Sequence, residues 1–77
     1  MVTNDSLWDA IEELARVNHL SCSGLAKVAG LDPTTFNRSK RASKYGQPRW
    51  LSLETIAKVL NKTHTPFTEF AKYIDKN

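Results

Sequence analysis

Hydrophobic residues recur every three or four positions in several parts of the chain, the spacing that places side chains on one face of an α-helix. The first such stripe predicts a helix from about Ser6 to Asn18, with Asn4 or Asp5 as its N-cap. Its apolar residues are Leu7, Ile11, Leu14 and Ala15, with Trp8 beside them. No stretch alternates between apolar and polar residues as a half-buried strand would, so the pattern predicts an all-α protein.

The segment SCSGLAKVAGLDPTTFNRSKR, residues 21–41, begins with a short predicted helix and a sharp turn. Ser21 is the expected N-cap of a helix from about Cys22 to Ala29, because its hydroxyl can accept a hydrogen bond from a free backbone N–H. Gly30 follows at the turn, where a positive φ carries no steric penalty. The small apolar face of this helix consists of Leu25, Ala26, Val28 and Ala29.

A third helix is expected from Pro33 to Ser39 or Lys40. Asp32 offers a capping carboxylate, and Pro33 has the backbone φ of a first helical residue. Phe36 is its one clearly apolar side chain, whereas the polar and basic residues are Thr34, Thr35, Asn37, Arg38, Lys40 and Arg41. A polar helix that follows a glycine turn is typical of a helix-turn-helix, here about residues 21–41, whose second helix lies in the major groove of DNA.

The remaining residues predict a loop and two further helices. Residues 41–51 contain Gly46 and Pro48 without periodicity, which favours a loop. Ser52 is the expected cap of a fourth helix, and Thr65 precedes Pro66 at the start of a last helix; residues 75–77 are expected to fray. The predicted inward residues are Leu53, Ile56, Ala57, Val59 and Leu60, then Phe67, Phe70, Ala71 and Ile74. The pattern therefore predicts a compact bundle of about five short helices in one domain, residues 1–77.

Charge is distributed unevenly along the chain. The net charge of +3 combines an acidic N-terminal part with residues 23–50, which hold six Lys or Arg and one Asp. The excess of +5 in this central part coincides with the expected third helix and the loop after it. A basic region opposed to an acidic one is the electrostatic pattern of a nucleic-acid-binding protein, although a solvated surface alone would produce charge runs too.

Composition excludes several other classes of protein. No apolar run is long enough to cross a bilayer, the N-terminus does not resemble a secretion signal, and Cys22 is the single cysteine. We therefore expect a cytoplasmic protein, associated with the nucleoid when bound to DNA. His19, Cys22 and His64 lack the paired spacing of a zinc site, and no nucleophile–base set is present, so we expect no metal, no cofactor and no enzymatic activity.

The segment 21–41 resembles the helix-turn-helix of the lambda-repressor-like superfamily (the Cro/repressor or XRE type). Ala26 stands where the two helices cross, Gly30 at the turn and Phe36 at the inward position of the second helix, with Leu25, Ala29 and Leu31 as apolar neighbours of the turn. Ser39 departs from the family, which usually buries an apolar side chain there, so the second helix is expected to end early or tilt, with Trp50 filling the space. The runs GLDPTTFNRSKR, QPRW and SLETIAKVLN resemble the N-terminal domain of phage repressors that carry a LexA-like self-cleaving peptidase domain.

This resemblance covers about Leu7 to Ile74 and implies a sequence-specific regulator that binds double-stranded operator DNA, a repressor of the prophage type. The residues expected to contact base edges are Thr34, Thr35, Asn37 and Arg38, because the start of the second helix faces the groove. The residues expected to contact phosphates are Ser21, Cys22, Ser23, Lys40, Arg41, Lys44 and Arg49. Tyr45 is a weaker candidate for a phosphate contact.

Two other functions remain open at this level. The first is an antitoxin-type autoregulator, which uses the same fold to bind DNA. The second is a protein-interaction module that uses its aromatic last helix as a docking surface. A homodimer is also compatible with the sequence, either through an exposed Tyr73 or Ile74 of the last helix or through a C-terminal domain that this chain does not contain.

Overall fold

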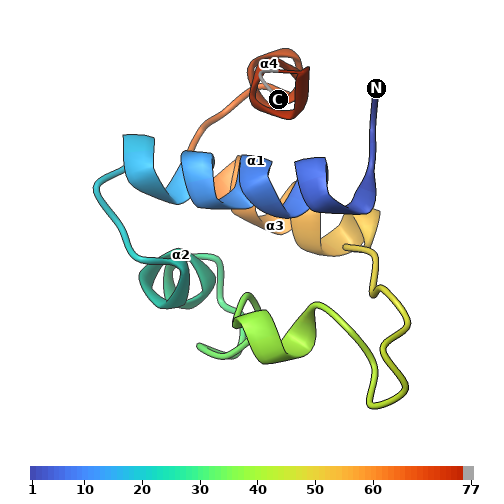
Figure 1. The fold of residues 1–77 in the computed structure, drawn as a ribbon. Coiled ribbons are helices and arrows are strands. Elements are labelled where there is room, and N and C mark those ends of the chain that lie inside the picture. Colours follow the sequence, from blue (N-terminus) through green and yellow to red (C-terminus); the bar gives the residue numbers. More distant parts are fainter. Residues whose placement is uncertain (76–77) are drawn as a thin grey trace.

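The computed structural model describes residues 1–75 and contains four α-helices. These are α1 (Asn4–Val17), α2 (Cys22–Val28), α3 (Leu53–Lys62) and α4 (Phe67–Asp75), with a short 3-10 helix, η1 (Arg38–Lys40), between α2 and α3. Figure 1 shows α4 on one side of α1 and α3, with α2 and η1 on the other side. Residues 1–75 contain no strand, which confirms the prediction of an all-α protein.

One hydrophobic core joins the four α-helices. α1 packs against both α4 and α2, and α2 packs against α3. Each α-helix contributes a fully buried side chain to the core, namely Leu14, Leu25, Val59 and Phe70. Phe36, from the segment between α2 and η1, is buried to the same degree. The irregular middle of the chain is therefore part of the core, although it is not an α-helix.

Hydroxyl side chains begin three of the helices. Ser21 Oγ accepts from the Gly24 N–H at 3.0 Å, and Ser52 Oγ accepts from the Thr55 N–H at 3.1 Å, as predicted. The prediction for α1 was wrong by one or two residues. Thr3, and neither Asn4 nor Asp5, is its N-cap, and the side chains of Thr3 and Ser6 each bond to the other residue's backbone N–H.

Three helices end in the same way, with a left-handed residue after the C-cap. After α2, Gly30 has φ 75°, its N–H donates to Lys27 O, and the next N–H donates to Ala26 O. The corresponding left-handed residues are His19 after α1 (φ 59°) and His64 after α3 (φ 54°), with the same pair of backbone bonds. The predicted glycine turn is confirmed, and two histidines occupy equivalent positions at a steric cost.

The predicted α-helix from Pro33 to Ser39 or Lys40 is wrong. Backbone bonds in this segment join residues three apart, from the N–H of Thr35 to Asp32 O and from the N–H of Asn37 to Thr34 O, both 3.0 Å. Asn37 then adopts an extended conformation (φ −64°, ψ 148°), so η1 is separated from the preceding turn. Residues 1–75 therefore form four α-helices where the sequence predicted about five.

Side-chain hydrogen bonds explain why this helix does not form. Asp32 Oδ1 accepts from both the N–H and the hydroxyl of Thr34, at 2.8 and 2.6 Å. The Thr35 hydroxyl donates to Asp32 O at 2.6 Å. Such local bonds compete with the helical ladder, and β-branched threonines add an entropic penalty in a helix. The cap residue that was expected to start the helix instead closes a tight turn.

The predicted loop from Arg41 to Leu51 contains a compact hairpin. Ala42 and Pro48 form an isolated antiparallel bridge, and the N–H of Arg49 donates to Arg41 O at 2.9 Å. At the tip, the N–H of Gly46 donates to Ser43 O at 2.9 Å, and Gly46 has φ 79°. We call residues 41–49 the basic hairpin.

Several apolar side chains predicted to face inward are exposed. They are Val28, Trp50, Leu53, Ala57 and Phe67. Leu53 and Phe67 are the first residues of α3 and α4. Trp50 is 60% exposed and does not pack beneath Ser39. Conversely, Ile74 is buried and Tyr73 half-buried, so the contact surface predicted on the last helix is mostly covered. Of the residues expected to fray, 76 and 77 lie outside the described part.

Candidate nucleic-acid interface

Trp8 of α1 is the point to which the basic hairpin is attached. Its ring is 5% exposed, and its Nε1–H donates to Arg49 O at 3.1 Å. The side-chain amide of Asn4, one turn earlier in α1, donates to the same carbonyl at 2.9 Å. A buried indole N–H needs an acceptor, and this one is supplied by a residue 41 positions later in the chain. α1 therefore fixes where the hairpin ends.

Phe36 holds the turn that precedes η1 against the same tryptophan. The two rings meet edge to face, with centroids 6.4 Å apart. Because Phe36 is 1% exposed, this contact lies within the core. Trp8 thus contacts both the turn and the end of the hairpin.

Arg41 is directed inward, whereas the sequence suggested a phosphate contact. Its guanidinium carbon lies 4.9 Å from the centroid of the Trp8 ring, a cation–π distance. Its Nη2 donates to Phe36 O at 3.3 Å and to Glu12 Oε1 at 3.2 Å. The side chain is 16% exposed. Arg41 therefore stabilises the turn and the hairpin, and little of it is open to a phosphate.

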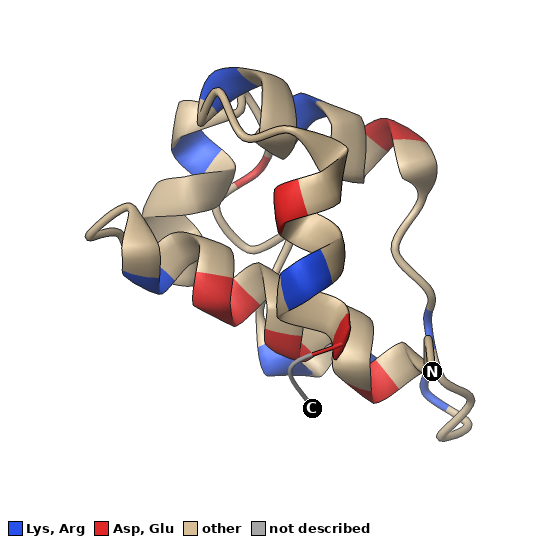
Figure 2. Cartoon of the chain, turned by 90° about the horizontal axis from the view of Figure 1, so that it is seen from above, with Lys and Arg blue, Asp and Glu red and all other residues tan. Residues whose placement is uncertain are grey.

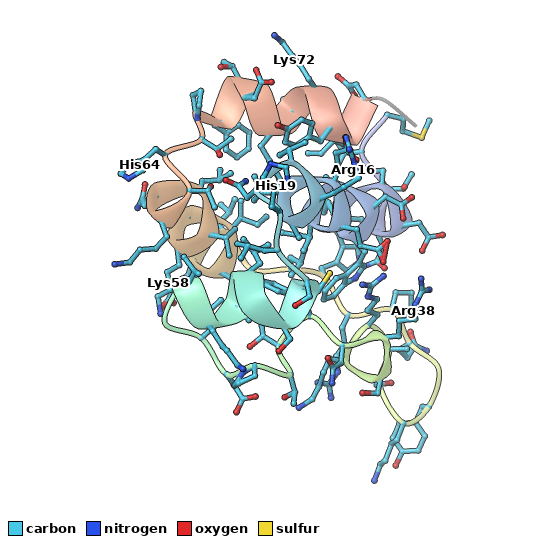
Figure 3. The ribbon with its side chains drawn as sticks, turned by 90° about the vertical axis from the view of Figure 1, so that its left-hand side faces the viewer. Arg16, His19, Arg38, Lys58, His64 and Lys72 are labelled. Atoms are coloured by element: carbon cyan, nitrogen blue, oxygen red, sulfur yellow. The ribbon has the colours of Figure 1, made fainter. Side chains whose placement is uncertain are left out.

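The four residues predicted to contact bases lie close together in the chain but not along an α-helix. Thr34, Asn37 and Arg38 are exposed, and Thr35 is half-buried. Arg38 forms an ion pair with Glu12 of α1, with 3.6 Å between Nη2 and Oε1. Figure 3 shows Arg38 on the side of α1 that faces away from α4 and Lys72.

The exposed cations of this region belong to η1 and the hairpin. Lys40, Lys44 and Arg49 are exposed, and the Lys44 ammonium lies 5.1 Å from the centroid of the Tyr45 ring. Tyr45 is itself exposed at the hairpin tip. In Figure 2 the hairpin carries blue positions and no red one, while red positions lie along α1 and α4. The charge asymmetry of the sequence is thus also an asymmetry in space.

The start of α2 is less available for a phosphate contact than the sequence predicted. The Ser21 side chain is exposed, but its oxygen already accepts the N-cap hydrogen bond. Cys22 and Ser23 are half-buried. Burial raises the pKa of the Cys22 thiol, with a smaller contribution from the Glu12 carboxylate, so the thiol is neutral near pH 7. Ser21, Cys22 and Ser23 therefore add no charge to the surface formed by η1 and the basic hairpin.

A polar cleft of about 350 Å³ lies between the turn, η1 and the start of α3. Thr35 and Lys40 line one part of it, and Arg49 and the exposed Trp50 line another. The hydroxyl of Ser52, at the N-cap of α3, also borders it. Two of the predicted phosphate contacts, Lys40 and Arg49, therefore meet at one cleft, which the sequence did not predict.

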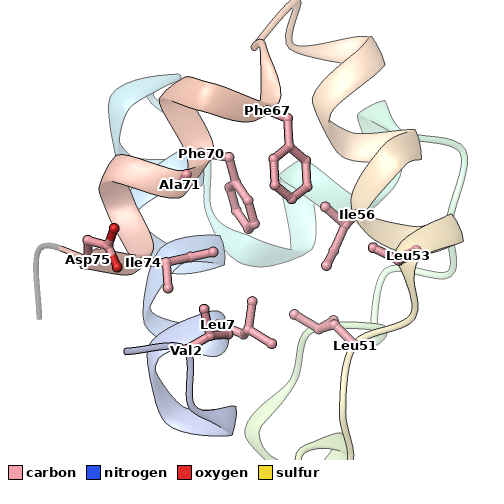
Figure 4. Close-up of a pocket in the computed structure, with 10 residues that line it drawn as sticks. All are labelled: Val2, Leu7, Leu51, Leu53, Ile56, Phe67, Phe70, Ala71, Ile74 and Asp75. Carbon is pink, nitrogen blue, oxygen red and sulfur yellow. The ribbon is translucent and has the colours of Figure 1, made fainter.

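A second cavity has a different character and lies between α1, α3 and α4. It has a volume of about 290 Å³, and its lining is apolar apart from Asp75. Figure 4 shows Phe67 of α4 and Leu53 of α3 at this cavity, with Ile56 of α3 between them and Leu7 of α1 across the cavity. Because Phe67 and Leu53 are exposed, the cavity opens to an apolar surface.

The sequence analysis missed the three α1 residues that position this region, Asn4, Trp8 and Glu12. The sequence predicts that Trp8 lies beside the apolar stripe, and it assigns no role to Glu12. The available signal was the indole N–H, which is seldom buried without an acceptor. That signal predicts a partner for Trp8, but it cannot identify Arg49 as the partner.

Comparison with protein-family models, curated proteins and solved structures finds no match. In residues 1–75 no three His, Cys, Asp or Glu side chains gather as metal ligands would. None of the helices there has the length and apolar character needed to cross a membrane.

Proposed function

We propose that this protein is a sequence-specific double-stranded DNA-binding regulator, a repressor of the prophage type, and that residues 32–49 are its reading surface. The supporting observation is that exposed hydrogen-bonding and cationic side chains gather on one segment that Trp8 holds in place. In this proposal α2 and the following turn act as a helix-turn-helix whose second element is a turn and η1. The resemblance to lambda-repressor-like domains supports the same function.

The side chains divide by chemistry into reading and holding groups. Arg38 can donate two parallel bonds to guanine, and Asn37 can pair with adenine. Thr34 can place its methyl group against that of thymine. Lys40, Lys44 and Arg49 contact phosphates, which adds affinity through counterion release without sequence preference.

Selection of bound duplexes from a random pool tests the proposal directly. We expect an enriched motif, and a palindromic motif would indicate that two copies bind together. Arg38→Ala should weaken binding to the motif by about 1–3 kcal/mol and relax preference at one base pair. Lys44→Ala should weaken all duplexes alike and reduce the salt dependence.

Lys72→Ala is the matched control for Lys44→Ala, because Lys72 is an exposed lysine of α4 on the opposite side from Arg38. It removes the same charge and should leave DNA affinity almost unchanged. If wild-type protein enriches no motif, or if Arg38→Ala leaves affinity and base preference as they were, the proposal is wrong.

A protein-interaction module is the second candidate, and the apolar cavity favours it. Phe67 and Leu53 expose apolar surface beside that cavity, which is the usual character of a protein contact. A complex with a protein partner that persists at high salt, together with no binding to duplex DNA, would favour this function over the first.

A further inference from the structure

A chain of contacts runs from the core to Arg38. Trp8 is 5% exposed, and the side chain of Arg41, whose guanidinium lies over the Trp8 ring, is 16% exposed. Arg41 donates to Glu12 Oε1, and the same oxygen faces Arg38 Nη2 at 3.6 Å. The side chains of Glu12 and Arg38 are 36% and 84% exposed. Exposure therefore rises at each step, from a buried ring to a solvent-facing guanidinium.

We propose that Glu12 is a positioning residue for Arg38, and that it sets the discrimination between cognate and unrelated DNA. This inference rests on the proposed function. Glu12 is held by Arg41, which is in turn held by the Trp8 ring and by Phe36 O. An ion pair between two mobile surface side chains contributes little. Here the Glu12 carboxylate is fixed by the half-buried Arg41, so it can restrict the conformations of the Arg38 side chain.

The physical consequence for DNA has two parts. A long arginine side chain loses conformational freedom when it reads a base, and restricting it beforehand reduces that loss. The negative charge of Glu12 also lies beside the cations of this surface, so it weakens their attraction for phosphates of any sequence. Glu12 therefore favours base reading by Arg38 over unspecific adhesion to the backbone.

Glu12→Gln removes the charge and keeps an oxygen that can accept from Arg41, so the mobility of Arg38 reports the first effect and the affinity for unrelated duplexes reports the second. In the absence of DNA, the NMR order parameter of the Arg38 Nε–H bond should fall while the fold is retained. With DNA, affinity for unrelated duplexes should rise, and the ratio of cognate to unrelated affinity should fall about fivefold. Asp9→Asn is the matched control. Asp9 is exposed on the same helix and makes no ion pair with any described residue.

Arg38→Lys provides an independent check. It keeps the charge but loses the planar pair of donors, so it should lower discrimination by itself. Added to Arg38→Lys, Glu12→Gln should lower discrimination by less than it does in the wild type, since the guanidinium that Glu12 positions is gone. Additive losses would overturn the inference, as would an unchanged Arg38 order parameter in Glu12→Gln. A wild-type protein that binds no duplex preferentially would instead overturn the proposed function, and that result appears before any variant is compared.

Discussion

Two neighbouring segments with similar sequence signals adopt different structures. α2 begins at Ser21 and residues 32–40 begin at Asp32, and both starting residues use their side-chain oxygen to accept a backbone N–H. α2 continues as an α-helix to Val28. The second segment makes only turns closed by backbone bonds between residues three apart, followed by η1. A capping side chain alone therefore does not determine that a helix follows.

The two segments obtain their stability from different contacts. The backbone of α2 is hydrogen-bonded within the helix, and the helix ends with the backbone bonds around Gly30. Residues 32–49 depend on distant side chains, through Phe36 against Trp8 and through the carbonyl of Arg49. We expect substitutions in α1 to disturb this segment more than substitutions within its own exposed positions.

Phe36→Ala should have the largest effect. Phe36 is fully buried in a segment that is not an α-helix, so its removal should cost about 3–5 kcal/mol of unfolding free energy through lost burial and a cavity. Urea unfolding followed by circular dichroism measures this loss. Tyr45→Ala, at the exposed hairpin tip, is the aromatic control and should change stability by less than about 0.5 kcal/mol. A loss below about 1 kcal/mol for Phe36→Ala would show that the segment is peripheral to the core.

Trp8→Phe should have a smaller and more local effect. It keeps an aromatic ring but removes the N–H that donates to Arg49 O, for which we expect a loss of about 1–2 kcal/mol. Hydrogen exchange should accelerate at the N–H groups of Ser43 and Arg49 more than at those of α2. Equal acceleration in α2 would mean that Trp8 does not act on the hairpin specifically. Asn4→Ala removes the other donor to this carbonyl and should have the weaker effect.

Replacing the left-handed histidines tests the helix ends. His19→Gly and His64→Gly should each raise the unfolding free energy by about 0.5–1 kcal/mol, because glycine adopts this conformation without the Cβ penalty. Gly30→Ala, the reverse change after α2, should lower it by about 1 kcal/mol. Denaturant midpoints at one pH measure all three. Unchanged stability in both histidine variants would contradict the assignment of strain to these positions.

Thr34→Val should have the smallest effect and concerns the turn itself. Hydrogen bonds from the Thr34 hydroxyl and backbone N–H lower the pKa of Asp32. The ionised carboxylate is thus favoured by folding, and its contribution is present above the ordinary pKa of aspartate and lost as pH falls through the lowered pKa. Thr34→Val removes the hydroxyl donor, so the pKa of Asp32 should rise toward its ordinary value. An NMR titration of the Asp32 carboxyl carbon checks this, and an unchanged pKa would contradict a hydrogen bond from the Thr34 hydroxyl to this carboxylate.

Local signals in the sequence predicted much of the helical framework. Ser21 and Ser52 cap helices where expected, and Gly30 ends α2 where expected. These features depend on bonds between residues a few positions apart, which a sequence pattern can represent. The exposure of Asn37 and Arg38 was also predictable, because polar side chains avoid an apolar core. Their role in reading DNA stays a prediction.

Only the tertiary structure determines which tryptophan and which arginine is buried. Trp8 is buried and Trp50 is exposed, and Arg41 points inward while Arg38 points outward. In each pair the residue type is the same, so composition and periodicity could not separate them. The outcome depends on contacts between α1 and residues about thirty to forty positions later. A buried polar group needs a hydrogen-bond partner. For Trp8 and Arg41 that partner lies far along the chain, so these contacts form only when the chain folds.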